Sequence, residues 1–149
     1  MRVSTRTVVV ALVASFAAAC APQVSSRSGA GPDAARNDPV RAVMLVQKPQ
    51  HVKLALRTGA EMLGGKGLPA RAITVVACGE EVASLRAGGD LEPDLAAARS
   101  AGVRVAACGI SLERAGLDAR ALSASIEVVP NGLVEVLRLQ HDGYLSVEP

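Results

Sequence analysis

From residue 40 onward, apolar residues alternate between short unbroken runs and longer stretches where they recur every three or four positions. The unbroken runs predict strands at 40–46, 72–77, 103–107, 126–129 and 144–147. The helical spacing predicts helices or helical turns at 50–63, 80–85, 91–101, 111–115 and 133–141. Strands that alternate with helices predict an α/β domain with a mainly parallel sheet and helices on both of its faces.

Residues that start and stop helices fall at the edges of these stretches. Pro49 suits the first turn of a helix, and we expect Asp90 and Asn131 to cap the helices that follow them. Gly102 and Gly143 are suited to helix ends. The glycine-rich run at 64–67 lacks the spacing of a phosphate-binding loop and follows a helix, so it predicts a turn.

Charge and aromatic content argue against nucleic acid as a partner. The chain has 149 residues with 16 Lys and Arg against 14 Asp and Glu. Arg2 and Arg6 lie in a predicted leader without acidic residues, so the remainder balances 14 cations (16 − 2) with 14 anions. Its one aromatic residue is Tyr144. Such a chain has neither a field that steers toward phosphate nor rings on which bases stack.

The first residues have the pattern of an export signal. A basic start is followed by a run at 8–19 that is apolar except for Ser15 and is too short to span a bilayer. Ala17-Ala18-Ala19-Cys20 resembles a bacterial lipobox, with Ala17 where Leu is usual. We therefore expect a signal peptide at 1–19 and a lipid on Cys20. The alternative is ordinary cleavage that leaves Cys20 unmodified.

The stretch that follows is rich in Ser, Gly, Pro and Ala and has no apolar period. It predicts a lipid-anchored flexible tether at 20–38, followed by one folded domain at 39–149. The expected location is the cell envelope, with a membrane-anchored domain that faces the periplasm or the cell exterior.

Two cysteines end two of the predicted strands in nearly identical contexts, Val-Val-Ala-Cys78-Gly and Val-Ala-Ala-Cys108-Gly. Sites in parallel sheets gather at the carboxyl ends of strands, and a helix N-terminus lowers the pKa of a thiol. We expect Gly109 to allow backbone N–H groups to approach the Cys108 sulfur. Ser111 is expected to cap the following turn, with Arg114 one turn further on.

Cys108 is the first candidate for a reactive thiol and Cys78 the second. Glu80 and Glu81 follow Cys78 and would raise the pKa of its thiol, which opposes reactivity. Two alternatives stay open. Both cysteines suit a role as small buried apolar residues. If their strands are neighbours, the two also lie within disulfide range, and an oxidising envelope favours that bond.

Other candidate chemistry is weak. His51 and His141 fall in different helices, and two Cys and two His at these spacings match no metal-ligand pattern. The first strand is followed by Gln47-Lys48-Pro49 rather than by a glycine-rich loop. We therefore expect no metal and no flavin or dinucleotide cofactor.

The carboxyl half also carries a family pattern. It consists of GVRVAACG at 102–109, Ser111-Leu112, Gly116-Leu117, VVPNGLVE at 128–135, LRLQ at 137–140 and Gly143-Tyr144. With these residues the chain resembles sulfur-relay proteins of the DsrE/DsrF/YchN type, more loosely in its amino half, over residues 40–149. The chain departs from the pattern at Ile110, where many members have Asn, and at Cys78, where Cys is not expected.

The resemblance implies a three-layer α/β/α fold with a five-stranded parallel sheet, close to flavodoxin-like folds. It implies homo-oligomers, often trimers or hexamers, and a persulfide carried on Cys108. Three functions follow as hypotheses. One is an envelope-tethered sulfur carrier that exchanges sulfur with donor and acceptor proteins. The others are a non-catalytic oligomeric binding module and a Cys78/Cys108 thiol-disulfide redox element.

Overall fold

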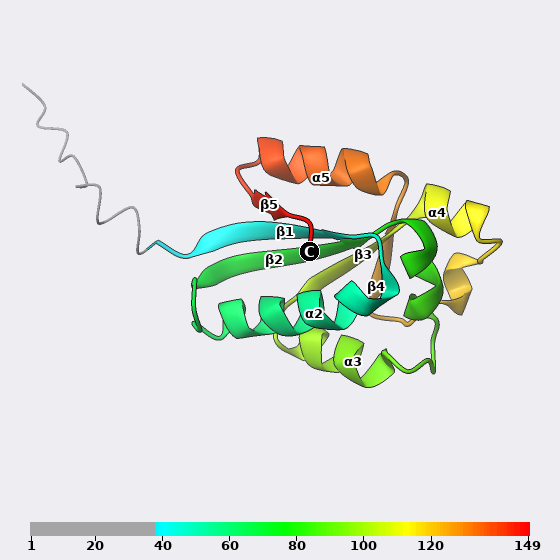
Figure 1. Ribbon diagram of the computed structural model, residues 1–149, viewed down its shortest axis with the longest axis horizontal. Helices are drawn as coiled ribbons and strands as arrows, with labels where there is room; N and C mark the ends of the chain where they lie inside the picture. The colour runs from blue at the N-terminus through cyan, green and yellow to red at the C-terminus, as the bar shows by residue number, and fades with distance from the viewer. Residues whose placement is uncertain (1–37) are drawn as a thin grey trace, which may run out of the picture.

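The computed structural model describes residues 38–149, which form a single five-stranded parallel sheet flanked by helices (Figure 1). The predicted signal peptide, Cys20 and all but the last residue of the predicted tether lie outside the described residues. The strands are β1 (Val40–Val46), β2 (Ala70–Ala77), β3 (Arg104–Cys108), β4 (Ile126–Val129) and β5 (Leu145–Val147). Their order across the sheet is β4-β3-β2-β1-β5. All four strand pairings are parallel.

Helices cover both faces, which confirms the three-layer α/β/α architecture. On one face lie α2 (Pro49–Leu63) and α3 (Glu92–Ser100), and on the other lies α5 (Gly132–His141) (Figure 1). The shorter elements are η1 (Gly79–Leu85), a 3-10 turn after β2, α4 (Gly109–Arg114) after β3, and η2 (Ala119–Ala121) before β4. Within residues 38–149, no helix is long and apolar enough to cross a membrane.

The strand order explains why α5 lies apart from the other helices. From β1 to β4 each connection steps to the next strand in one direction, and right-handed crossovers in one direction place their helices on one face. The connection from β4 to β5 runs back across the whole sheet, so the same handedness places α5 on the opposite face. This strand order differs from the flavodoxin order 2-1-3-4-5. The chain therefore shares the three-layer α/β/α arrangement of flavodoxin-like folds but not their strand order.

Two apolar clusters, one on each face of the sheet, form the core. The larger cluster joins α2, α3 and η1 to the strands and includes Leu56, Leu85 and Leu95, which are almost completely buried. The smaller cluster lies under α5 and joins Val136 and Leu139 to side chains of the central strands, including both cysteines. The cysteines therefore point to the α5 face.

The predicted strands and main helices are confirmed to within about two residues, and two helix starts differ. Asp90 does not cap α3. A turn brings the Glu92 N–H to the Gly89 carbonyl, so that Leu91 takes the capping position without a side-chain hydrogen bond. Ser111 does not cap α4, because that helix already begins at Gly109. Asn131 does cap α5, since its Oδ1 accepts hydrogen bonds from two N–H groups of the first turn.

Candidate functional site

Cys78 and Cys108 lie side by side at the carboxyl ends of neighbouring strands. The ladder between β2 and β3 ends with Ala77 opposite Ala107, and each cysteine comes next along its strand. Both are free thiols and both are buried, with 7% and 4% of their surface exposed. The expectation that their strands are neighbours is confirmed, and the two thiols are within hydrogen-bonding reach of each other.

Gly132, the first residue of α5, lies against both cysteines. Its N–H donates a hydrogen bond of 3.2 Å to Cys108 Sγ. A Cβ on this residue would collide with Cys78 Sγ and come within 3.1 Å of Cys108 Cβ. The site therefore needs a glycine here, because any side chain would displace the Cys78 sulfur.

The sequence predicts that Gly109 lets backbone N–H groups approach the Cys108 sulfur, and in the structure this glycine lies against the chain that follows β4. A Cβ on Gly109 would lie 3.2 Å from the carbonyl oxygens of Val129 and Pro130, so this glycine allows β3 to pack against the end of β4. The N–H group of Gly132 reaches Cys108 because the chain reverses after β4. In the sequence, the Pro130-Asn131-Gly132 stretch marks the start of a helix after a strand, and this pattern could have indicated an N–H donor there.

Ser111 links the two strand ends. Its Oγ accepts a 2.8 Å hydrogen bond from the Gly79 N–H, and both its hydroxyl and its backbone N–H lower the pKa of Cys108. Gly79 has a φ of +71°, a conformation that side chains disfavour, and so turns the chain sharply after Cys78. Ser111 is thus a contact of the sulfur rather than the helix cap that the sequence predicted.

These hydrogen bonds decide the ionisation of Cys108. Burial opposes a thiolate, but hydrogen bonds from the Gly132 N–H, from both groups of Ser111 and from the Cys78 thiol outweigh burial and lower the pKa of Cys108. The N-terminus of α5 adds a positive partial charge on the same side. Cys108 is therefore the thiol that ionises, as its place at a helix start predicted.

Cys78 behaves in the opposite way, for a reason that differs from the predicted one. Burial, together with the neighbouring Cys108, raises the pKa of Cys78 to about 12. The predicted direction is correct, but Glu80 and Glu81 are not the cause. Glu81 is buried away from the thiols, hydrogen-bonds to Ser84 and interacts with His51, and burial raises its own pKa. Cys78 stays protonated and acts as a donor.

A cavity of about 240 Å³ gives access to the two thiols. Ile110 and Leu133, both exposed, stand at its rim. The remaining lining residues come from four strand ends and the helices that follow them: Gln47, Cys78, Gly79, Cys108, Ser111, Arg114 and Asn131. The sequence did not identify Gln47, Asn131 and Leu133 as lining residues. No local pattern shows that the end of β1 and the start of α5 lie beside the two cysteines.

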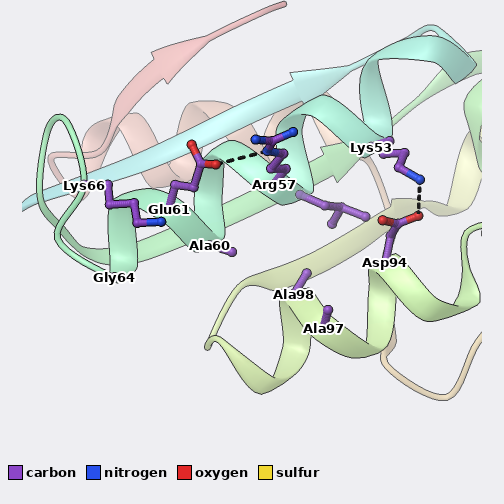
Figure 2. A pocket seen from close by; sticks show the side chains of 10 residues that line it. Lys53, Arg57, Ala60, Glu61, Gly64, Lys66, Asp94, Ala97 and Ala98 are labelled. Atoms are coloured by element: carbon purple, nitrogen blue, oxygen red, sulfur yellow. Dashed lines mark hydrogen bonds and ion pairs between the residues drawn. The ribbon is translucent and has the colours of Figure 1, made fainter.

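A larger groove lies between α2 and α3 and is lined by neither cysteine. The groove between α2 and α3, of about 410 Å³, has an apolar floor of Leu56, Ala97 and Ala98 and a charged rim. Figure 2 shows the ion pair across it, with Lys53 Nζ 3.1 Å from Asp94 Oδ2. Within residues 38–149, no three His, Cys, Asp or Glu side chains converge as metal ligands.

Fold and site together define a three-layer α/β protein with an adjacent pair of buried thiols at the carboxyl edge of a parallel sheet. The profile of the DsrE/DsrF-like family matches residues 45–148, and the chain belongs to that family. This confirms the family resemblance of the sequence. No curated protein matches the chain.

Two solved structures are similar to the chain. One is a protein of unknown function from Methanobacterium thermoautotrophicum (MTH1491), with a TM-score of 0.66 and 25% identity over 74% of this chain and 99% of that chain. The other is a conserved protein of unknown function from Bacteroides thetaiotaomicron (BT1422). It has a TM-score of 0.55 and 14% identity over 72% of this chain and 94% of that chain, and it shows the fold alone.

The hydrogen bond from Cys78 predicts a pH effect on Cys108. Cys78→Ala removes the donor, so the pKa of Cys108 should rise and the midpoint of its alkylation rate should move to higher pH. Cys78→Ser keeps a donor and should leave the midpoint near that of the wild type. Below the midpoint, the Ala variant should react about fivefold more slowly, since one hydrogen bond contributes about 1 kcal/mol.

The measurement is the rate of Cys108 alkylation against pH, followed by peptide mass mapping. Cys78 is absent from both variants, so the comparison between them isolates the donor. Equal midpoints in the Ala and Ser variants would contradict a donor role for Cys78.

Proposed function

We propose that this member of the DsrE/DsrF-like family carries sulfur as a persulfide on Cys108. Membership of the family supports a role related to sulfur relay. The observation that supports this residue most is the Gly132 N–H, 3.2 Å from Cys108 Sγ, in a site that lowers the pKa of that thiol. A thiolate is the nucleophile in sulfur exchange, so a stabilised thiolate beside a cavity suits this chemistry.

The loading step is a sulfur exchange. The Cys108 thiolate attacks a sulfane sulfur of the donor, and a new S–S bond forms as the S–S bond within the donor breaks. The electron pair of the broken bond leaves with the remainder of the donor, and Cys108 keeps an anionic persulfide. The hydrogen-bond donors around Cys108 stabilise negative charge before and after this step.

A thiol-disulfide role is the second candidate, supported by the contact between the two cysteines. Loss of two electrons and two protons to an external oxidant would join Cys78 and Cys108 and remove the nucleophile. The high pKa of Cys78 disfavours its attack on a disulfide partner, which is why the carrier ranks first.

Sulfur loading tests the carrier directly. In the full chain with Cys20→Ser, Cys78 and Cys108 are the two cysteines that remain of three. After reduction and exposure to polysulfide, intact mass should increase by one sulfur atom in this protein and in its Cys78→Ser variant, but not with Cys108→Ser. Absence of a gain from reduced protein would exclude the carrier. If the non-reduced protein has no alkylatable thiol, the redox element is favoured instead.

We further propose that the exposed apolar side of α5 packs against other copies of the chain. Its buried side faces the sheet through Val136 and Leu139, whereas Leu133, Val134 and Leu137 point outward and are more than half exposed. Leu145 and Val147 on β5 are similarly exposed. Apolar residues gathered on one face are typical of an interface, and closed homo-oligomers are the commonest assemblies.

The chain offers a matched pair of leucines to test this interface. Leu137→Glu places a charge on the outer side of α5 and should reduce the sedimenting species to monomer. Leu54→Glu places the same charge on α2, at a leucine with similar exposure (55% against 63%), and should leave the assembly unchanged. Sedimentation velocity measures both. An unchanged assembly in the Leu137 variant would rule out the α5 surface.

We also propose that the domain is tethered to a membrane of the cell envelope through a lipid on Cys20, with residues 20–38 as spacer. The support is the export pattern that ends in Ala-Ala-Ala-Cys. Several acyl chains, each contributing about 0.8 kcal/mol per buried methylene, would make a stable anchor.

Cys20→Ser removes the only residue that can take this lipid and should release the protein from the membrane fraction. Cys78→Ser serves as the matched control and should stay membrane-bound. Fractionation and immunoblotting measure both. Membrane association that persists in the Cys20 variant would contradict the anchor.

A further inference from the structure

The cavity beside Cys108 adjoins a second hollow of about 250 Å³. The two share Gly79, Ser111 and Arg114. The inner one contains the thiols, and the outer one is lined also by Glu80 and Ala115. Arg114 therefore lines both the hollow that contains the thiols and the hollow beside it.

Arg114 is placed on the cavity side by the same helix that places Ser111. The two residues are three apart in α4 and so lie on one face of the helix. Ser111 turns toward Cys108, while Arg114 is exposed at the junction of the two hollows. Arg114 is the one cationic side chain among the residues that line them.

The positive charge of Arg114 is also not neutralised by an ion pair within residues 38–149. Among residues 38–149, four arginines are held by carboxylates, whereas Arg114, like the exposed Arg71, is in none of these ion pairs. The four are Arg57 with Glu61, Arg104 with Glu127 and Glu135, Arg120 with Asp118, and Arg138 with Glu135 and Asp142. No ion pair of this part of the chain includes Arg114. The acid that lines the outer hollow is Glu80, which is exposed to solvent.

The inner hollow offers further hydrogen-bond donors. Asn131 uses its Oδ1 to accept from the Leu133 and Val134 N–H groups at the start of α5. Its amide nitrogen is thus left as a donor group in the lining of the cavity. A guanidinium and an amide at the mouth, with N–H and O–H donors around the sulfur, favour a negatively charged ligand.

We propose that the two hollows form a binding site for a small anion that carries a sulfane sulfur, with Arg114 holding the anionic end while Cys108 attacks the sulfur. This inference rests on the proposed carrier function and names the class of its donor. Thiosulfate and inorganic polysulfide share this chemistry. With thiosulfate, the Cys108 thiolate bonds to the outer sulfur, the S–S bond of thiosulfate breaks, and its electron pair leaves with sulfite.

Such a donor needs a cation at this place for a simple reason. A thiolate and an anionic donor repel each other, and the electron pair of the breaking S–S bond adds negative charge to the oxyanion that leaves. The planar guanidinium of Arg114 counters both effects and offers paired donors to an oxyanion.

Two alkylating agents that differ in charge test the anion site without depending on sulfur transfer. Iodoacetate is anionic and iodoacetamide is neutral, and both modify the same thiolate. The ratio of their rates at Cys108 cancels changes in ionisation and access. In the full chain with Cys20→Ser, Arg114→Ala should lower this ratio by about threefold, the scale of one solvent-exposed charge interaction. Arg114→Lys should retain most of it, and added salt should reduce the wild-type ratio toward that of Arg114→Ala.

Arg71→Ala is the matched control. Arg71 is an exposed arginine on β2, near the opposite end of the strand from Cys78, and its loss should leave the ratio unchanged. If Arg114→Ala and Arg71→Ala give the wild-type ratio, the anion site is excluded. If Cys108 in the folded protein reacts with neither agent, both the site and the carrier are excluded.

Loading with each donor then separates the two proposals. Intact mass after thiosulfate and, separately, after polysulfide should show one added sulfur atom, gained more slowly in Arg114→Ala with at least one of them. The donor whose loading is slowed in Arg114→Ala is the one that binds at this site. If Arg114→Ala lowers the alkylation ratio as expected but neither donor adds sulfur to Cys108, the anion site is supported and the carrier function is overturned. If wild type and Arg114→Ala gain sulfur equally fast from both donors, the assignment of an anionic donor held by Arg114 is overturned, while the carrier function is supported.

Discussion

The structure depends on the reversal of the chain after β4. Within residues 38–149, three of the four connections place their helices on one face of the sheet, and the other face is covered by α5. Val43, Val76 and Ala106 on that face are completely buried. Burying them requires the chain to cross the sheet from one edge to the other. The start of that crossing brings the Gly132 N–H to Cys108 Sγ.

This arrangement also places the site at a topological switch point. The chain leaves β3 toward α4, on the α2 side of the sheet, and leaves β4 toward α5, on the other side. Connections that diverge from neighbouring strands leave a crevice at the strand ends, which is where open parallel sheets bind ligands. Cys108 ends β3 at this crevice, and Asn131 and Gly132 form its other wall.

The two thiols are nearly identical in sequence context and opposite in chemistry. Both end a buried strand in Ala-Cys-Gly, and both are removed from solvent. Cys108 receives N–H and O–H hydrogen bonds, whereas Cys78 contacts Cys108 and the Cα of Gly132 and finds no such donors. Cys78 therefore keeps its proton and adds one hydrogen bond to its neighbour. In the proposed carrier, Cys108 is the nucleophile and Cys78 is the hydrogen-bond donor beside it.

The sequence by itself determined the fold class, because apolar runs of strand length and stretches of helical spacing are local patterns. It also determined that Cys108 and Cys78 end strands, and that Asn131 caps the last helix. It did not determine that Gly132 donates to Cys108, that Ser111 bonds across to Gly79, or that burial rather than Glu80 and Glu81 keeps Cys78 protonated. These contacts join residues 24 or more positions apart, and only the strand order and the side of the sheet on which α5 crosses bring them within hydrogen-bonding distance.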